Sequence, residues 1–116
     1  MMLEEIKKAL ETVDPRVYYG AAGTLDDGDL WDYIVFARKT LNVTGGATGL
    51  ADGYQVAIVR ENYIPEETVD AVIEAMKTVP GMRLAGNEFS YYYETKPKTN
   101  IVLEMLVIDF KKARKS

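Results

Sequence analysis

The sequence predicts an α+β domain: an antiparallel sheet of four to five strands with two helices packed on one face. Two segments carry apolar residues at helical spacing, and the segments between them are rich in β-branched and aromatic residues. The chain has 116 residues, 47% of them hydrophobic, which is the usual size and composition of one domain with one core. We therefore expect residues 1–116 to form a single domain.

Both predicted helices are amphipathic. The buried stripe of the first consists of Leu3, Ile6, Leu10 and Val13. That of the second consists of Val69, Val72, Ile73 and Met76. Asp14-Pro15 ends the first helix, because the residue before a proline avoids the α region. Pro65 suits the first position of the second helix, and Pro80-Gly81 stops it. Two helices of this length cover one face of a sheet.

Strands are expected at residues 16–19, 30–38, 54–61, 83–94 and 101–110, the last two forming a hairpin. Because consecutive strands joined by loops usually pair antiparallel, we expect an antiparallel sheet. The apolar run from Val56 to Val59 is typical of a strand buried on both faces. The Gly-rich residues 40–53 are predicted to form a flexible loop with a role in function.

Composition limits the possible functions. The chain has no cysteine and no histidine, so disulfides and the commonest proton-transfer and metal-binding side chains are absent. Its net charge is −4, and its main basic cluster, residues 111–116, is expected to be a solvated tail. We therefore expect no sequence-specific nucleic-acid partner. No signal-peptide core and no run of about 20 apolar residues is present, which predicts an intracellular, soluble protein without membrane contact.

The strand at 101–110 is apolar on both faces. One face carries Val102, Leu106, Ile108 and Phe110, with Glu104 among them. Since the helices cover only one face, the other would expose several large side chains, and exposed apolar patches usually mark interaction surfaces. We expect a subunit interface; the alternative is that the sheet curls and the 40–53 loop covers this face. The expected interface residues are Ile101, Leu103, Met105, Val107, Tyr91 and Tyr93.

Four other features have a possible chemical role beside a plainer structural one. Residues 26–29 (DDGD) resemble a cation loop but lack EF-hand spacing, which favours a turn. Residues 45–49 (GGATG) resemble a phosphate-binding loop, yet no Gly-Lys-Ser/Thr follows, which favours a flexible loop. Residues 91–93 (YYY) could stack on bases, although cross-strand packing is the simpler reading. Glu104 could have a raised pKa, but a salt bridge to Lys or Arg is favoured. We predict no catalytic residue, no metal site and no cofactor.

From Leu30 onward the sequence resembles the tail terminator and head–tail joining proteins of tailed phages and prophages. The resemblance lies in residues 30–36 (LWDYIVF), 56–65 (VAIVRENYIP) and 99–115, with EMLVI at 104–108. It implies a small α+β structural protein without enzymatic activity. Such proteins form rings, typically hexamers, that end the tail tube and join it to the head; some are monomeric until they meet the tube.

The resemblance also implies partners and a location. The partners would be tail-tube and head-connector proteins, and the location the bacterial cytoplasm during assembly and then the virion. Residues 40–53 would reach toward the ring lumen or a neighbouring protein. The expected contact residues of this loop are Thr44, Gly45, Gly46, Thr48 and Gly49. The main alternative is a small-ligand or peptide-binding α+β domain with the Gly-rich loop as a lid, and the third is an enzyme that uses carboxylates.

Overall fold

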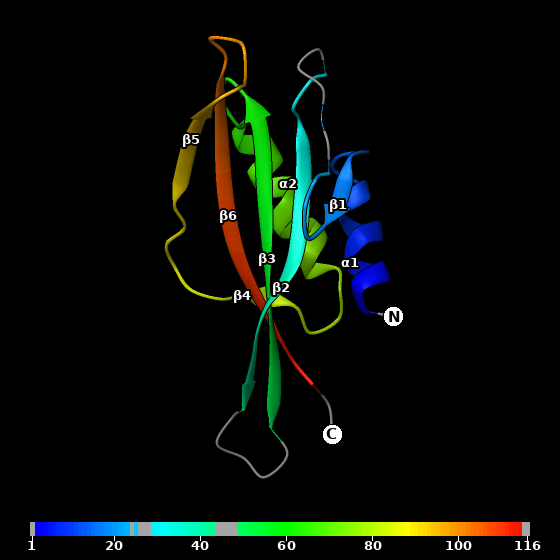
Figure 1. The fold of residues 1–116 in the computed structure, drawn as a ribbon. Coiled ribbons are helices and arrows are strands. Elements are labelled where there is room, and N and C mark those ends of the chain that lie inside the picture. The colour runs from blue at the N-terminus through cyan, green and yellow to red at the C-terminus, as the bar shows by residue number, and fades with distance from the viewer. Residues whose placement is uncertain (1, 24, 26–28, 44–48, 115–116) are drawn as a thin grey trace.

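The computed structural model describes residues 2–23, 25, 29–43 and 49–114 (Figure 1). Its elements in chain order are α1 (Met2–Glu11), β1 (Val17–Tyr19), β2 (Tyr33–Val43), β3 (Leu50–Glu61), α2 (Glu66–Lys77), β4 (Arg83–Leu84), β5 (Tyr91–Thr95) and β6 (Val102–Ala113). The predicted α+β class and both predicted helices are confirmed. Pro65 lies directly before α2, as its N-cap, rather than at its first helical position.

In the described part of the chain, six strands form one mixed sheet. Its order is β1-β2-β3-β6-β4, and β5 also pairs with β6. Four strand pairs are antiparallel, but β1 runs parallel to β2, so the expected antiparallel sheet of four to five strands is only roughly matched. The connection between β1 and β2 is long, and Gly20 and Gly23 adopt positive φ within it. Because β1 and β2 are parallel, this connection brings the chain back to the end of the sheet at which β1 begins before β2 starts.

Both helices pack on one face of the sheet and form the core with it (Figure 1). The buried helix residues include Ile6, Leu10, Val72 and Met76. The strands contribute Ile34, Phe36, Val56, Ile58, Leu106, Ile108 and Phe110. These strand residues alternate along each strand and meet across the strand register, as a one-sided core requires. We call the side that they occupy the helix-facing side.

The expectation of a loop at residues 40–53 is wrong for most of that segment. Thr40–Val43 continue β2 and Leu50–Gly53 begin β3, and the two strands pair from Tyr33↔Val59 to Val43↔Leu50. A bulge at Lys39 interrupts the register between Arg38 and Thr40. This hairpin extends beyond the helices (Figure 1). We call residues 39–43 and 50–53 the arm.

The C-terminal part also differs from the prediction in two respects. The strand expected at 83–94 is split: β4 pairs with Lys111 and Phe110, whereas β5 pairs with residues 102–106. Gly86, between the two, has a φ of 108° that few side chains tolerate. Residues 111–113, expected to begin a solvated tail, complete β6 opposite β3 instead. The remainder of the predicted tail includes Lys115, which lies outside the described residues.

Candidate functional site

The sheet has one side that the helices do not cover. Alternation and register place a row of mainly apolar side chains there, and most of them are half-buried. We call this surface the open face. Its apolar and aromatic residues are Tyr18, Tyr33, Val35, Ala37, Ala57, Met105, Val107 and Tyr92, and the same register adds the polar Gln55 and Asp109 beside Ala37. The rings of Tyr18 and Tyr33 meet edge to face, with their centroids 5.9 Å apart. In Figure 1 the helices lie behind the sheet, so the open face is turned toward the viewer.

One end of this side of the sheet is closed by a buried ion pair. Lys96 Nζ lies 2.8 Å from Glu61 Oε2 and also donates to the Asp29 carbonyl. The Trp31 amide donates to the same Glu61 oxygen at 2.7 Å, and Lys96 Nζ lies 5.8 Å from the centroid of the Trp31 ring. The bond from Lys96, followed by that from Trp31, lowers the pKa of the Glu61 carboxyl below its usual value.

This closed end explains why two apolar residues on the side away from the helices are not exposed. Val59 and Leu103 keep only 3% and 2% of their surface accessible. Leu103 is paired in register with Glu61, and Val59 lies two residues before Glu61 on the same side of β3. The uncovered surface is therefore the middle of the sheet, where Val35, Ala57 and Val107 form a row across β2, β3 and β6.

The structure separates the six residues that the sequence predicted as an interface. Met105 and Val107 lie on the open face, while Leu103 is buried at its closed end. Ile101 precedes β6 and is half-buried. Tyr91 and Tyr93 are exposed but lie opposite Leu106 and Glu104, on the helix-facing side. Their grouping with Met105 and Val107 is therefore wrong, because in an antiparallel pair directly opposite residues share a face.

The sequence reasoning missed Tyr92 and the contributions of β2 and β3 to the open face. Tyr92 lies opposite Met105 and is exposed. Val35 and Ala57 alternate with the buried Ile34, Phe36, Val56 and Ile58. That alternation was visible in the sequence, but the register that brings Val35, Ala57 and Val107 together was not.

Glu104 has partners other than the predicted Lys or Arg. Its Oε2 accepts a hydrogen bond from the Tyr93 hydroxyl at 2.9 Å, and its Oε1 accepts one from the Ile64 amide at 2.8 Å. The carboxylate thus joins β5 to the turn that precedes α2.

The arm is a second surface, with two large apolar side chains that the other described residues leave exposed. Leu41 and Val43 expose 56% and 80% of their surface and point to the helix-facing side, although the helices do not reach them. Two ion pairs hold the base of the arm to β6. Lys39 Nζ lies 2.8 Å from Asp109 Oδ2, and the Arg114 guanidinium holds both oxygens of Asp52 at 2.6 and 2.8 Å.

Of the five predicted loop contacts, Thr44, Gly45, Gly46 and Thr48 lie outside the described residues, and Gly49 directly precedes β3. The 26–28 part of the DDGD segment also lies outside them. Among the residues that the structure describes, no group of three or more carboxylates is arranged to hold a metal ion. No helix in the described ranges is long and apolar enough to cross a membrane. Comparison with known proteins found no matching family model and no matching curated protein.

Proposed function

We propose that this chain is a structural subunit that assembles with copies of itself, as the tail terminator and head–tail joining proteins of tailed phages do. The observation that carries the proposal is the open face. Val35, Ala57 and Val107 form an uncovered apolar row in the centre of the sheet, on strands that cannot shift register without disturbing the core. Contiguous apolar surfaces of this kind mark interaction sites.

The arm is a second observation that supports the same proposal. It exposes Leu41 and Val43 at a distance from the core, where they contribute little to the stability of a single copy. The arm and the open face differ in shape and composition, so a contact between them joins unlike surfaces on two copies. Contacts of this head-to-tail kind generate closed rings when the rotation between subunits closes.

In this proposal the protein has no catalytic step. A ring of such subunits would end a tail tube and present a surface to the head connector, which is the role that the sequence resemblance implies. The absence of histidine and cysteine is consistent with a role carried by surfaces rather than by reactive groups.

The test compares two neighbouring positions on opposite sides of β6. Val107→Lys places a charge on the open face, where we expect a stability change within about 1 kcal/mol but loss of self-association. Ile108→Lys buries a charge at a position that is 1% exposed, so we expect it to unfold the domain. Light scattering across concentration measures assembly, and thermal melting measures fold.

Two outcomes contradict the proposal. If the wild-type chain stays monomeric at high concentration and also in the presence of tail-tube protein, self-assembly fails. If Val107→Lys assembles like the wild type, the open face is not the contact between copies.

A further inference from the structure

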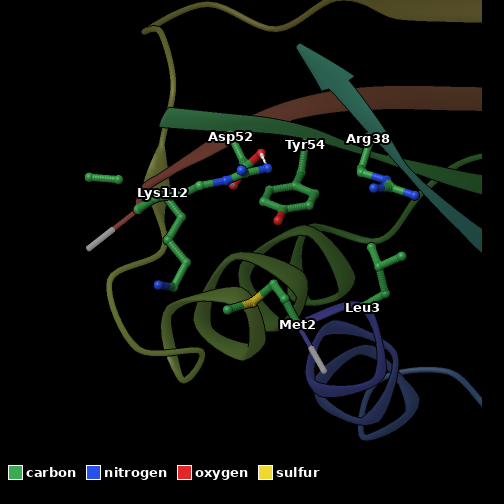
Figure 2. A pocket seen from close by; sticks show the side chains of 8 residues that line it. Met2, Leu3, Arg38, Asp52, Tyr54 and Lys112 are labelled. Atoms are coloured by element: carbon green, nitrogen blue, oxygen red, sulfur yellow. Dashed lines mark hydrogen bonds and ion pairs between the residues drawn. The ribbon is translucent and has the colours of Figure 1, made fainter. Parts of the chain in front are cut away.

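A cavity of about 290 Å³ lies between the first turn of α1 and the base of the arm (Figure 2). This volume lies just below the usual range for ligand pockets. Its lining residues are Met2, Leu3, Arg38, Asp52, Tyr54, Lys112, Ala113 and Arg114. The strand residues Arg38, Tyr54 and Lys112 stand on the helix-facing side of the sheet. The cavity is therefore separate from the open face.

No hydrogen bond joins the Tyr54 hydroxyl to another described residue. The residue as a whole is only 4% exposed, but its hydroxyl oxygen remains accessible from the cavity. Figure 2 shows its oxygen directed away from the strands and toward the helices. Burial, and then the nearby Asp52 carboxylate, raise the pKa of Tyr54, so the phenol keeps its proton and can donate it to an acceptor in the cavity.

The cavity also carries more positive than negative charge. The Asp52 carboxylate is engaged by Arg114 through both oxygens. Arg38 donates from Nε to the Tyr19 hydroxyl at 3.1 Å and, within the described residues, faces no carboxylate at ion-pair distance. Lys112 likewise has no carboxylate partner in that part of the chain. Its stem runs beside Gly81, where an added Cβ would lie 3.6 Å from Lys112 Cε. Arg38 and Lys112 thus add positive charge to the cavity from opposite sides of Tyr54 (Figure 2).

The rest of the lining is apolar. Met2 and Leu3 line the cavity from α1 (Figure 2), and Ala113 of β6 is also among its lining residues. A ligand that uses both parts must carry a negative group beside a hydrophobic one. A free inorganic anion would leave the apolar wall unused, and a neutral apolar group would leave the cations and the Tyr54 hydroxyl unpaired.

We propose that this cavity binds a peptide segment of a partner protein in which a carboxylate stands next to an apolar side chain, such as a chain terminus that ends in leucine. The Tyr54 hydroxyl donates a hydrogen bond to the carboxylate, Arg38 and Lys112 add positive charge from opposite sides of Tyr54, and the apolar side chain packs on Met2 and Leu3. This inference does not depend on the open face, so it can be tested separately from the proposed self-assembly.

The probe is N-acetyl-leucine, titrated into the isotope-labelled full chain and followed by backbone amide NMR. We expect saturable shifts confined to the residues that line the cavity. N-acetyl-leucinamide, which differs only by lacking the charge, should give no saturable shift. Acetate and inorganic phosphate carry a negative charge but no apolar side chain, so they test the apolar part of the cavity. We expect both to bind at least about tenfold more weakly than N-acetyl-leucine, because burial of a leucine side chain contributes more free energy than a tenfold change in affinity requires.

Three variants locate the site. Tyr54→Phe removes one hydroxyl and is expected to weaken binding of N-acetyl-leucine about three- to tenfold, the range for one hydrogen bond. Lys112→Gln should weaken it by a similar factor. Lys111→Gln removes the same charge from the next residue, which faces the other side of the sheet, and should change nothing. Folding of each variant is checked from its own amide spectrum before titration.

Several results would overturn the proposal. They are the absence of saturable shifts, equal binding of the amide, equal binding of acetate or phosphate, and equal weakening by Lys111→Gln. Equal binding of phosphate would reassign the cavity to small anions, and equal binding of the amide would make it a purely apolar site. Light scattering on the Tyr54→Phe variant reports separately on self-assembly.

Discussion

At the scale of single residues, buried ion pairs decide how the connections attach to the sheet. Lys96 and Glu61 are 5% and 11% exposed, and they hold the segment around Trp31 against the end of the sheet. Arg60 and Asp14 form a similar pair at 2.7 Å, which joins the end of α1 to β3. The sequence could not predict the first pair: Lys96 lies in what reads as a polar turn, and Glu61 precedes it by 35 residues. Only the fold brings them together.

The Glu61 carboxyl should make stability depend on pH. Its pKa is lower in the folded state than the ordinary value of 4.5, so its contribution is fully present above that value and is lost as the pH falls through the folded pKa. Thermal melting of the wild type between about pH 6 and pH 3 should therefore show a decline that is shallower in Glu61→Gln. Glu94→Gln, which removes an exposed carboxylate from β5, is the control variant for loss of one negative charge. A Glu61→Gln variant with the full wild-type slope would contradict this assignment.

At the scale of elements, the β2–β3 hairpin is where sequence reasoning failed most clearly. Glycine and threonine between residues 40 and 53 indicated a loop, yet most of the segment is strand. The reason is local and steric. The Thr40 hydroxyl lies over Gly53, where an added Cβ would collide with it. Glycine is therefore required here by a close approach between two strands, not by a need for flexibility, and composition alone does not distinguish the two cases.

Gly53→Ala should consequently loosen the arm without unfolding the domain. The new Cβ overlaps the Thr40 side chain, so we expect the free energy of unfolding to fall by about 1–3 kcal/mol and the arm amides to exchange hydrogen faster. Removing the Thr40 hydroxyl in the double variant Thr40→Ala/Gly53→Ala should restore most of the loss. Ala51→Val, two residues earlier on the same side of β3, is the matched control and should be tolerated. If the double variant is no more stable than Gly53→Ala, the collision is not the cause.

At the scale of the whole molecule, what the sequence could predict is the layering and not the topology. Alternation in the strands and helical spacing in α1 and α2 were enough to place both helices on one side of a sheet, because each pattern is a property of one segment. The parallel pairing of β1 and the division of the 83–94 strand depend on where connections lead the chain, and no single segment encodes that. The molecule is also elongated, 53 × 26 × 25 Å, with the arm extending past the helices.

The elongated shape leads to a prediction about the arm. Arg38 and Tyr54 face each other across the hairpin, so residues 39–53 can be replaced by Asn-Gly, which closes a two-residue turn. The core residues of β2 and β3 all lie outside the deleted segment, so we expect the shortened chain to melt cooperatively. Its stability should fall somewhat, because the C-terminal end of β6 loses its pairing with β3. Self-association should be lost, because the open face of one copy would no longer meet the arm of the next. Assembly of the shortened chain to the wild-type size, measured by light scattering, would mean that the arm makes no contact between copies.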